Sequence, residues 1–471
     1  MKHSVYIVTL MWLPSTVLGN QFFLFPKGFQ FGAATSSGQT ESYNPERPHQ
    51  YARFVNECNQ SKDPKNHKIP AKRCCLFETY YKTYIKEAHD IGLTLLRFSI
   101  AWEKVNPAPD VFDKEEIQRY KDMCKECKKY GITPLITLYH YTEPIWFWDA
   151  GSFEKEKKSD YFIAFCVKMF NALKEYNPLW VTFNTASGVM GKVYIKGERP
   201  VRLDEKSIYK KGSDCIKARD FKRAGLVLKN ILNTHVTVYK TLKAIDPSAQ
   251  IGFLKNIQQH DPYNSWNPLD VLGAKFANWM ADDSIISFLR TGQLNWFAPP
   301  STWVRYYNAD APQSFDFIGL NYYTRDFIKN FKPVQKDSDP KTTSSDKVIY
   351  PEGMYRALMT IHNDLIKPIQ QATGKDIPLY ITENGISALS DDDRKLFFEG
   401  YLEAIKNAID DGVNVKGYMV WALMDNWSWG KYDAKYGIFA VDQKTKHPTL
   451  KKDIGTTYLL DTIQYNKKQY A

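Results

Sequence analysis

The chain has 471 residues, of which 43% are hydrophobic and 15% aromatic, and this composition excludes a disordered or low-complexity protein. The formal charge is +11, but Lys and Arg are spread along the whole chain, which argues against nucleic-acid binding through a basic arm. The charge is compatible with a small anionic substrate, an acidic matrix or a generally basic solvated surface.

The N-terminus has the pattern of a secretory signal peptide. Lys2 and His3 precede an apolar run over residues 5–18, and a cleavage position follows Gly19. We therefore expect residues 1–19 to be removed, residues 20–471 to form the mature protein, and this protein to be secreted. No later run is long and apolar enough for a membrane span, and no membrane partner is expected.

Seven cysteines leave at least one thiol unpaired. They are Cys58, Cys74, Cys75, Cys124, Cys127, Cys166 and Cys215. In an oxidising compartment Cys58 can pair with Cys74 or Cys75, which predicts a disulfide bond without fixing its connectivity. Cys124 and Cys127 form a C-x-x-C, but no second Cys or His pair accompanies them. We interpret them as ordinary helix cysteines and expect no metal site.

Short apolar runs alternate with amphipathic segments along the mature chain. The runs predict eight strands, over residues 29–35, 93–100, 133–139, 179–184, 250–254, 315–322, 379–383 and 415–423. The segments between them predict helices over residues 78–91, 114–130, 160–175, 217–245, 351–373 and 392–411. This alternation predicts an α/β fold of one domain, the (β/α)8 or TIM barrel.

Four stretches interrupt the alternation and are polar or rich in Pro and Asn. They cover residues 43–72, 193–214, 258–312 and 325–350. We predict that they are loops after the first, fourth, fifth and sixth strands. In a barrel of this kind such loops build the mouth of the active site.

Polar and aromatic residues stand at or just after the ends of most predicted strands. Glu383 ends the seventh strand directly before Asn384 and Gly385, so its carboxylate is held rigidly where it can reach a pocket. Taken alone, Glu383 is compatible with a nucleophile or with a surface salt bridge. Since several other strands send polar groups to the same rim, the pattern favours a polar-ligand site.

Several motifs occur in an order that resembles the β-glucosidase-like glycoside hydrolases of family 1, from Phe25 to Val441. They are Phe29-Gln30-Phe31-Gly32-Ala33-Ala34-Thr35, Arg97-Phe98-Ser99-Ile100, Leu138-Tyr139-His140, Thr182-Phe183-Asn184, Asn321-Tyr322-Tyr323-Thr324 and Ile381-Thr382-Glu383-Asn384-Gly385. One such motif alone is weak evidence, whereas the ordered set is specific.

The resemblance implies a retaining mechanism, in which one carboxylate attacks the anomeric carbon and a second protonates the leaving oxygen. Glu383 matches the nucleophile, and Arg97 and Tyr323 match residues that keep it ionised and aligned. The positions that hold the sugar are matched by Gln39, His140, Asn184, Trp421 and Trp429. The implied partner is a small glycoside, with no cofactor and no nucleic acid, and we expect a monomer or homodimer.

Two positions depart from the family pattern. The acid/base glutamate should follow Asn184 directly, but Thr185 stands there, and Ala186 replaces the next proline. Ser428 stands where the family usually has a glutamate that binds the far hydroxyls of the sugar, and we keep it as a candidate substrate-binding residue.

A threonine hydroxyl cannot act as a general acid near neutral pH, and such an acid is worth about 10²- to 10⁴-fold in rate. A leaving group that is already a stable anion does not need it. Glucosinolates carry such an aglycone and a sulfate, and the plant thioglucosidases of this family also lack the acid/base. We therefore predict a secreted retaining β-thioglucosidase of the myrosinase type, with Lys192 or Arg305 as a candidate cation near the leaving group.

Two alternatives stay open. One is an ordinary β-glucosidase in which Glu143 or Glu198 has taken over as the acid, and the other is an inactive barrel that binds glycosides. The sequence also has two glycosylation sequons, at Asn59 and Asn426. We expect a glycoprotein modified at Asn59, since the resemblance puts Asn426 close to the sugar pocket.

Overall fold

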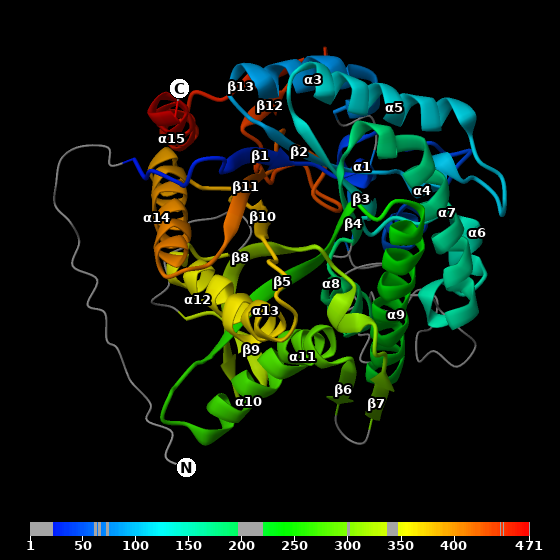
Figure 1. Cartoon of the computed structure of the whole chain (residues 1–471), viewed down its shortest axis with the longest axis vertical. Helices are drawn as coiled ribbons and strands as arrows, with labels where there is room; N and C mark the ends of the chain where they lie inside the picture. The colour runs from blue at the N-terminus through cyan, green and yellow to red at the C-terminus, as the bar shows by residue number, and fades with distance from the viewer. Residues whose placement is uncertain are drawn as a thin grey trace.

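The computed structural model describes residues 22–60, 64, 67–71, 75–195, 220–298, 302–336, 347–442, 444–445 and 447–470. Parallel strands form a closed barrel at its centre (Figure 1). They are β1 (Gln30–Ala34), β2 (Leu95–Ser99), β3 (Thr133–Tyr139), β4 (Leu179–Phe183), β5 (Gln250–Pro262), β8 (Phe317–Lys329), β10 (Leu379–Asn384) and β11 (Val415–Trp421). β10 pairs with both β8 and β11, which closes the ring. The predicted single-domain (β/α)8 barrel is confirmed.

Apolar side chains fill the interior of the barrel. The layer consists of Ala34, Leu95, Leu135, Val181, Leu254, Phe317 and Met419. Gly252 leaves room for the Phe317 ring, since a Cβ at Gly252 would lie 2.3 Å from that side chain. Because both faces of each strand are buried, the strands read as continuous apolar runs in the sequence. A ligand must therefore bind at the rim and not inside the barrel.

Helices surround the barrel. The longer ones are α3 (Phe77–Asp90), α5 (Lys114–Lys129), α7 (Ser159–Leu173), α9 (Phe221–Ile245), α12 (Pro351–Ile361), α14 (Asp391–Asp410) and α15 (Ile454–Tyr470). Side-chain caps fix where two of them begin: Asp113 accepts from the Glu116 amide before α5, and Ser390 accepts from the Asp393 amide before α14. The predicted helices over residues 114–130 and 392–411 agree with these bounds within one residue.

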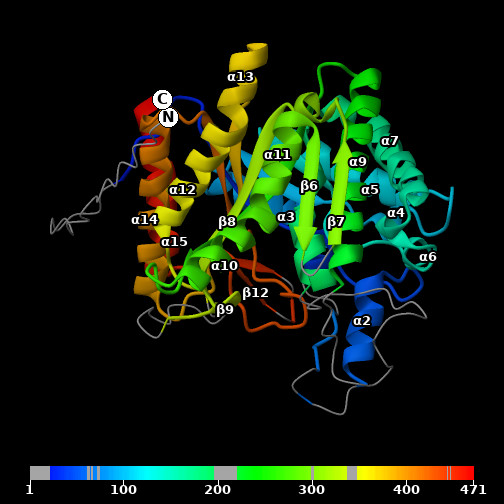
Figure 2. The ribbon, with the colours of Figure 1, turned by 90° about the horizontal axis from the view of Figure 1, so that it is seen from below.

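The prediction of a loop over residues 258–312 is wrong. In the structure β5 extends to Pro262 and is followed by α10 (Pro268–Asn278), the π-helical turn η6 (Trp279–Asp283), α11 (Ser284–Thr291), β6 (Gln293–Ala298) and β7 (Thr302–Tyr307). β6 and β7 form a hairpin beside α9 and α11 (Figure 2). Asn267 caps α10 and Pro268 occupies its first turn, so residues that resemble loop signals are helix-start signals here.

The other predicted loops also contain regular structure. Residues 43–72 include α2 (Gln50–Cys58), and residues 325–350 begin as the end of β8 and include β9 (Lys332–Val334). Residues 196–214 of the fourth-strand loop lie outside the described residues. The helix predicted over residues 351–373 is interrupted by a π-helical turn at His362–Ile366, because Pro368 has no N–H to donate to residue 364.

The described cysteines differ in their surroundings. Cys124 and Cys127 lie on the buried face of α5, as predicted for ordinary helix cysteines, and burial raises the pKa of Cys124 to about 12. The Cys75 thiol donates to the carbonyl oxygen of Asp425 at 3.1 Å. Because Cys74 lies outside the described residues, a disulfide from Cys58 stays a prediction.

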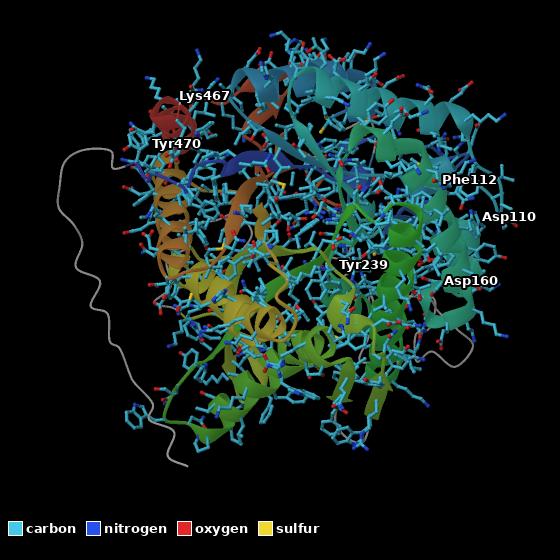
Figure 3. All side chains as sticks on the ribbon, in the orientation of Figure 1. Asp110, Phe112, Asp160, Tyr239, Lys467 and Tyr470 are labelled. Carbon is cyan, nitrogen blue, oxygen red and sulfur yellow. The ribbon has the colours of Figure 1, made fainter. Side chains whose placement is uncertain are left out.

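The last helix joins the two ends of the described chain. On α15, the hydroxyl of Tyr470 donates to the carbonyl oxygen of Phe25 at 2.6 Å, and Asn466 accepts from the Phe25 amide at 2.8 Å. This helix therefore packs against the segment that precedes β1. Figure 3 labels Tyr470 and Lys467 on this helix. Among the described helices, none has the length and apolar character needed to cross a bilayer.

Gly385 is required where β10 leaves the barrel. A Cβ at this position would lie 1.7 Å from the Trp421 carbonyl oxygen on β11. We expect Gly385→Ala to lower the free energy of unfolding by about 2–3 kcal/mol, measured by urea denaturation. Gly191→Ala is the control, because nothing lies within 4 Å of its Cβ position. Equal losses in the two variants would contradict this explanation.

Candidate active site

Glu383 lies at the C-terminal end of β10 and is 5% exposed. Its two carboxylate oxygens have different partners. Arg97 Nη1 donates to Oε1 at 2.6 Å, and the Tyr323 hydroxyl donates to Oε2 at 2.6 Å. Burial and the neighbouring carboxylate raise the pKa of Tyr323 well above its usual value, so this phenol keeps its proton and donates it. A cation and a phenol thus donate to opposite oxygens of the carboxylate and fix its orientation.

Arg97 connects four strands of the barrel. Its guanidinium on β2 is fully buried and, besides Glu383, donates to Thr137 Oγ1 at 3.0 Å, Asn184 Oδ1 at 2.7 Å and the Thr382 carbonyl oxygen at 3.2 Å. These acceptors belong to β3, the residue after β4, and β10. The guanidinium fork thus fixes the position of the Glu383 carboxylate relative to the strand ends.

Asn184 and His140 extend the same network. Asn184 Nδ2 lies 2.9 Å from His140 Nε2, and His140 Nε2 lies 3.9 Å from Glu383 Oε1. The His140 ring stacks at 6.0 Å from the Trp421 ring. Asn321 donates to Asn184 Oδ1 at 3.1 Å. The structure therefore brings five of the predicted site residues together at one end of the barrel, with Trp421 packed against one of them. The five are Arg97, His140, Asn184, Tyr323 and Glu383.

Gln39 binds the protein itself at both ends of its amide. It is 2% exposed, its Oε1 accepts from Ser36, and its Nε2 donates to Asn426 Oδ1 and to the Trp427 carbonyl oxygen, each at 3.0 Å. Gln39 thus links the segment after β1 to the segment after β11. A sugar at this position would have to share or replace these hydrogen bonds.

Ser428 and Trp429 lie on the segment after β11 and are partly exposed. The Ser428 amide donates to the Lys431 carbonyl oxygen at 2.8 Å. Trp429 has φ +52° and packs against Tyr51 at 4.7 Å and Tyr141 at 5.9 Å between ring centroids. This packing orients the indole beside Tyr141, which contacts the end of β4.

Thr185 follows Asn184 at the end of β4 and is 2% exposed. Its Oγ1 forms a hydrogen bond with the Tyr141 hydroxyl. Both residues have positive φ, +59° and +68°, which is uncommon for a β-branched or bulky residue. Gly188 leaves space for the pair, since a Cβ there would lie 2.3 Å from the Tyr141 oxygen. Two neutral hydroxyls therefore occupy the end of β4 next to the Arg97 network.

Several residues of this network were not predicted from the sequence. Thr137 and Thr382 point to Arg97 and Asn321 from inward positions of β3 and β10. Lys347 donates to the Tyr436 hydroxyl at 3.3 Å and lies 4.0 Å from the Tyr323 ring centroid. Alternation along each strand could have identified the threonines, whereas nothing in the sequence around Lys347 indicates its position.

The predicted cations are not part of this network in the described chain. Lys192 is an exposed residue of the π-helical segment Val189–Ile195. Arg305 lies on the β6–β7 hairpin, where its guanidinium stacks 4.9 Å from the Trp303 ring.

Glu143, the first alternative acid, is 1% exposed and lines a small cavity of about 20 Å³ together with Tyr141 and Tyr194. Its Oε2 accepts from Ser152 at 3.1 Å, whereas Oε1 has no hydrogen-bond partner among the described residues. Burial, with a contribution from the nearby Glu154, raises the pKa of Glu143 to about 8. Glu198, the other alternative, lies outside the described residues.

The two sequon asparagines have different surroundings. Asn426 is 4% exposed, and its side chain accepts from Gln39 and donates to the Met424 carbonyl oxygen. Asn59 is exposed at the end of α2. Glycosylation at Asn59 remains a prediction, and the contacts of Asn426 leave no space for a glycan there.

The raised pKa of Glu143 predicts a pH-dependent stability. Between pH 4.5 and about 8 the carboxyl is protonated in the folded chain and ionised in the unfolded chain, so wild-type stability should fall as pH rises. The quantity to compare is the free energy of unfolding of Glu143→Gln minus that of wild type. We expect this difference to be larger at pH 8 than at about pH 5, by roughly 2–4 kcal/mol in favour of the variant. Urea unfolding at both pH values measures this difference.

The control is Glu352→Gln on the exposed surface of α12, which should show no such growth with pH. If the difference between Glu143→Gln and wild type is the same at both pH values, Glu143 is not a buried neutral acid.

The comparisons with known proteins agree with this geometry. The sequence model of glycosyl hydrolase family 1 matches residues 22–468. Two 6-phospho-beta-galactosidases, from Clostridium acetobutylicum and Staphylococcus haemolyticus, are each 25% identical to this chain. The alignments cover 94% and 91% of this chain and 98% and 96% of those proteins.

Solved structures are similar over the same length. A beta-glycosidase from Pyrococcus horikoshii has a TM-score of 0.76 and 25% identity, covering 96% of this chain and 98% of its own. The GH1 beta-glucosidase from Exiguobacterium antarcticum B7 has a TM-score of 0.80 and 23% identity, covering 95% of this chain and 100% of its own.

Proposed function

The chain belongs to glycosyl hydrolase family 1, and we propose that it is a secreted retaining β-glycosidase for glycosides whose aglycone leaves as a stabilised anion. Thioglucosides of the glucosinolate class are the leading substrates. One contrast carries the proposal: Glu383 keeps both of its polar partners, whereas Thr185 and Tyr141 present only hydroxyls at the end of β4. Export rests on the signal-peptide pattern of residues 1–19, which lie outside the described residues.

In the first step Glu383 attacks the anomeric carbon. A bond forms between a carboxylate oxygen and this carbon, and the bond to the aglycone breaks with its electron pair remaining on the aglycone. Arg97 and Tyr323 hold the attacking carboxylate in one orientation, because each of its oxygens has a fixed donor. His140, Asn184 and Trp421 are the nearest candidates to contact the glycon.

Departure of the aglycone depends on its own acidity. The hydroxyls of Thr185 and Tyr141 are much weaker general acids near neutral pH than a carboxylic acid whose pKa lies close to the operating pH, so they give an alkoxide leaving group little help. A thiohydroximate leaves as an anion and needs no proton. Water then attacks the glycosyl ester of Glu383. The hydroxyl pair can orient this water but cannot deprotonate it, so this step should be slow or assisted by an external base.

The expected test compares three substrates with two variants. Wild type should hydrolyse a glucosinolate and an activated aryl β-glucoside faster than an alkyl β-glucoside. Thr185→Glu should raise turnover of the alkyl β-glucoside by about 10²- to 10⁴-fold, because it supplies a general acid at the end of β4. Steady-state rates on all three substrates measure both effects.

Thr185→Gln is the matched control, since it has the size of glutamate but no proton to give, and it should leave the alkyl β-glucoside a poor substrate. If wild type hydrolyses the alkyl glucoside as fast as the thioglucoside, another acid is present, and Glu143 is the first carboxyl to replace. If a 2-fluoro glucoside fails to label Glu383, the barrel binds glycosides without turnover.

A second candidate is a glycon that carries a phosphate. Ser428 is neutral where family members usually have a glutamate, whose carboxylate would repel a phosphate. The Lys347 ammonium group lies 4.0 Å from the centroid of the Tyr323 ring. The proteins of Clostridium acetobutylicum and Staphylococcus haemolyticus, named 6-phospho-beta-galactosidases, support this candidate. Recognition of a phosphate concerns the glycon, so it is compatible with a preference for aglycones that leave as stabilised anions.

An aryl 6-phospho-β-galactoside tested against the unphosphorylated aryl β-galactoside distinguishes this candidate. If phosphate is recognised, the phosphorylated substrate should have the higher kcat/KM, and Lys347→Gln should lower that value by about tenfold through loss of one charge contact. Lys467→Gln on α15, which lies beside the start of β1 at the other end of the barrel, should have no effect. Equal kcat/KM values for the two substrates in wild type would exclude a phosphate site.

A further inference from the structure

Two segments that are distant in the sequence form an exposed apolar projection, which we call the apolar tip. It consists of residues 263–276, around α10, and residues 329–336, around β9. Trp266 is 90% exposed, and Leu269, Leu272 and Phe331 are 52%, 55% and 53% exposed. Gly273 packs directly on the turn at Phe331, since a Cβ there would lie 3.0 Å from the Phe331 amide nitrogen.

A buried carboxylate holds the tip together. Asp270 is 1% exposed and accepts from the Asn264 amide at 3.0 Å, from Asn267 Nδ2 at 3.2 Å and from the Asn330 amide at 2.8 Å. These donors flank Trp266 on one segment and Phe331 on the other. The exposed apolar side chains are therefore presented on a fixed backbone, unlike scattered apolar residues on a mobile loop.

The charge on the tip is one-sided. Its four charged residues at the surface are lysines, at positions 275, 329, 332 and 336, and its only acidic residue is the buried Asp270. Two of the lysines lie against aromatic rings: Lys336 is 4.1 Å from the Phe327 centroid, and Lys329 is 4.7 Å from the Tyr263 centroid. The lysines therefore lie on the same two segments as the exposed Trp, Leu and Phe side chains.

The tip stands at the end of a ribbon that leaves the barrel on the side of the candidate active site. β5 and β8 stay paired from Asn256 and Asn321 out to Pro262 and Ile328, which is roughly 20 Å of extended chain. α10 lies at the lower edge of the molecule in Figure 1, and β9 lies towards its lower side in Figure 2.

We propose that the apolar tip docks the protein onto anionic lipid bilayers, with Trp266, Leu269, Leu272 and Phe331 in the interfacial region and the lysines against the headgroups. Among the described residues of the tip, exposed Trp, Leu and Phe occur together with four lysines and no exposed acid, which is the combination that binds such interfaces. The proposal does not depend on the glycosidase assignment, and it revises the expectation that the protein has no membrane partner.

The test is co-sedimentation of the mature protein with vesicles of phosphatidylcholine, with and without phosphatidylserine. Wild type should bind the phosphatidylserine vesicles and bind them less at high salt. Trp266→Ser combined with Leu272→Ser should weaken this binding by about tenfold or more, and Lys329→Gln combined with Lys332→Gln should weaken it and reduce the salt dependence.

Leu396→Ser is the matched control, because Leu396 is also a helical leucine at 55% exposure but lies on α14, outside the tip. It should bind vesicles as wild type does. Thermal unfolding of each variant verifies that the fold is intact. Failure of wild type to bind either vesicle, or equal losses in the tip and Leu396 variants, would overturn the proposal. So would a wild-type dimer that Trp266→Ser dissociates without any vesicle binding.

Discussion

The buried ion pair between Arg97 and Glu383 is the interaction on which the rest of the site depends. A guanidinium removed from water is tolerated only when its donors are satisfied, and Arg97 finds acceptors on β3, on β10 and after β4. The pair therefore also fixes how the ends of four strands lie relative to one another. Removing one partner of such a pair generally costs about 3–5 kcal/mol, so geometry and stability are coupled here.

The two sides of the candidate site differ in chemistry. Around Glu383 the contacts are ionic and charge-assisted, and they preorganise a carboxylate. At the end of β4 the contacts are between neutral hydroxyls, and Thr185 and Tyr141 adopt backbone conformations that are uncommon for their residue types. A site built in this way can supply a nucleophile but no strong acid, and so the leaving group decides which bonds break.

The net charge of the chain bears on function only through where individual lysines lie in the structure. Most of the lysines are solvated and carry no specific information about function. Two positions differ: Lys347 lies beside the Tyr323 ring, and the lysines of the apolar tip share their segments with exposed apolar side chains. The first arrangement bears on an anionic substrate, and the second on an anionic surface.

The sequence by itself determined the eight strands, most of the helices and the strand-end position of Glu383, because doubly buried strands and amphipathic helices leave regular apolar patterns. It did not reveal α10 and α11, since Asn267 and Pro268 signal either a loop or a helix start. Only the tertiary structure brought Arg97 to Glu383, joined Gln39 to Asn426 by a hydrogen bond, and packed Gly273 against Phe331. These contacts join residues far apart in the chain, and strand register and packing determine them, neither of which a local pattern specifies.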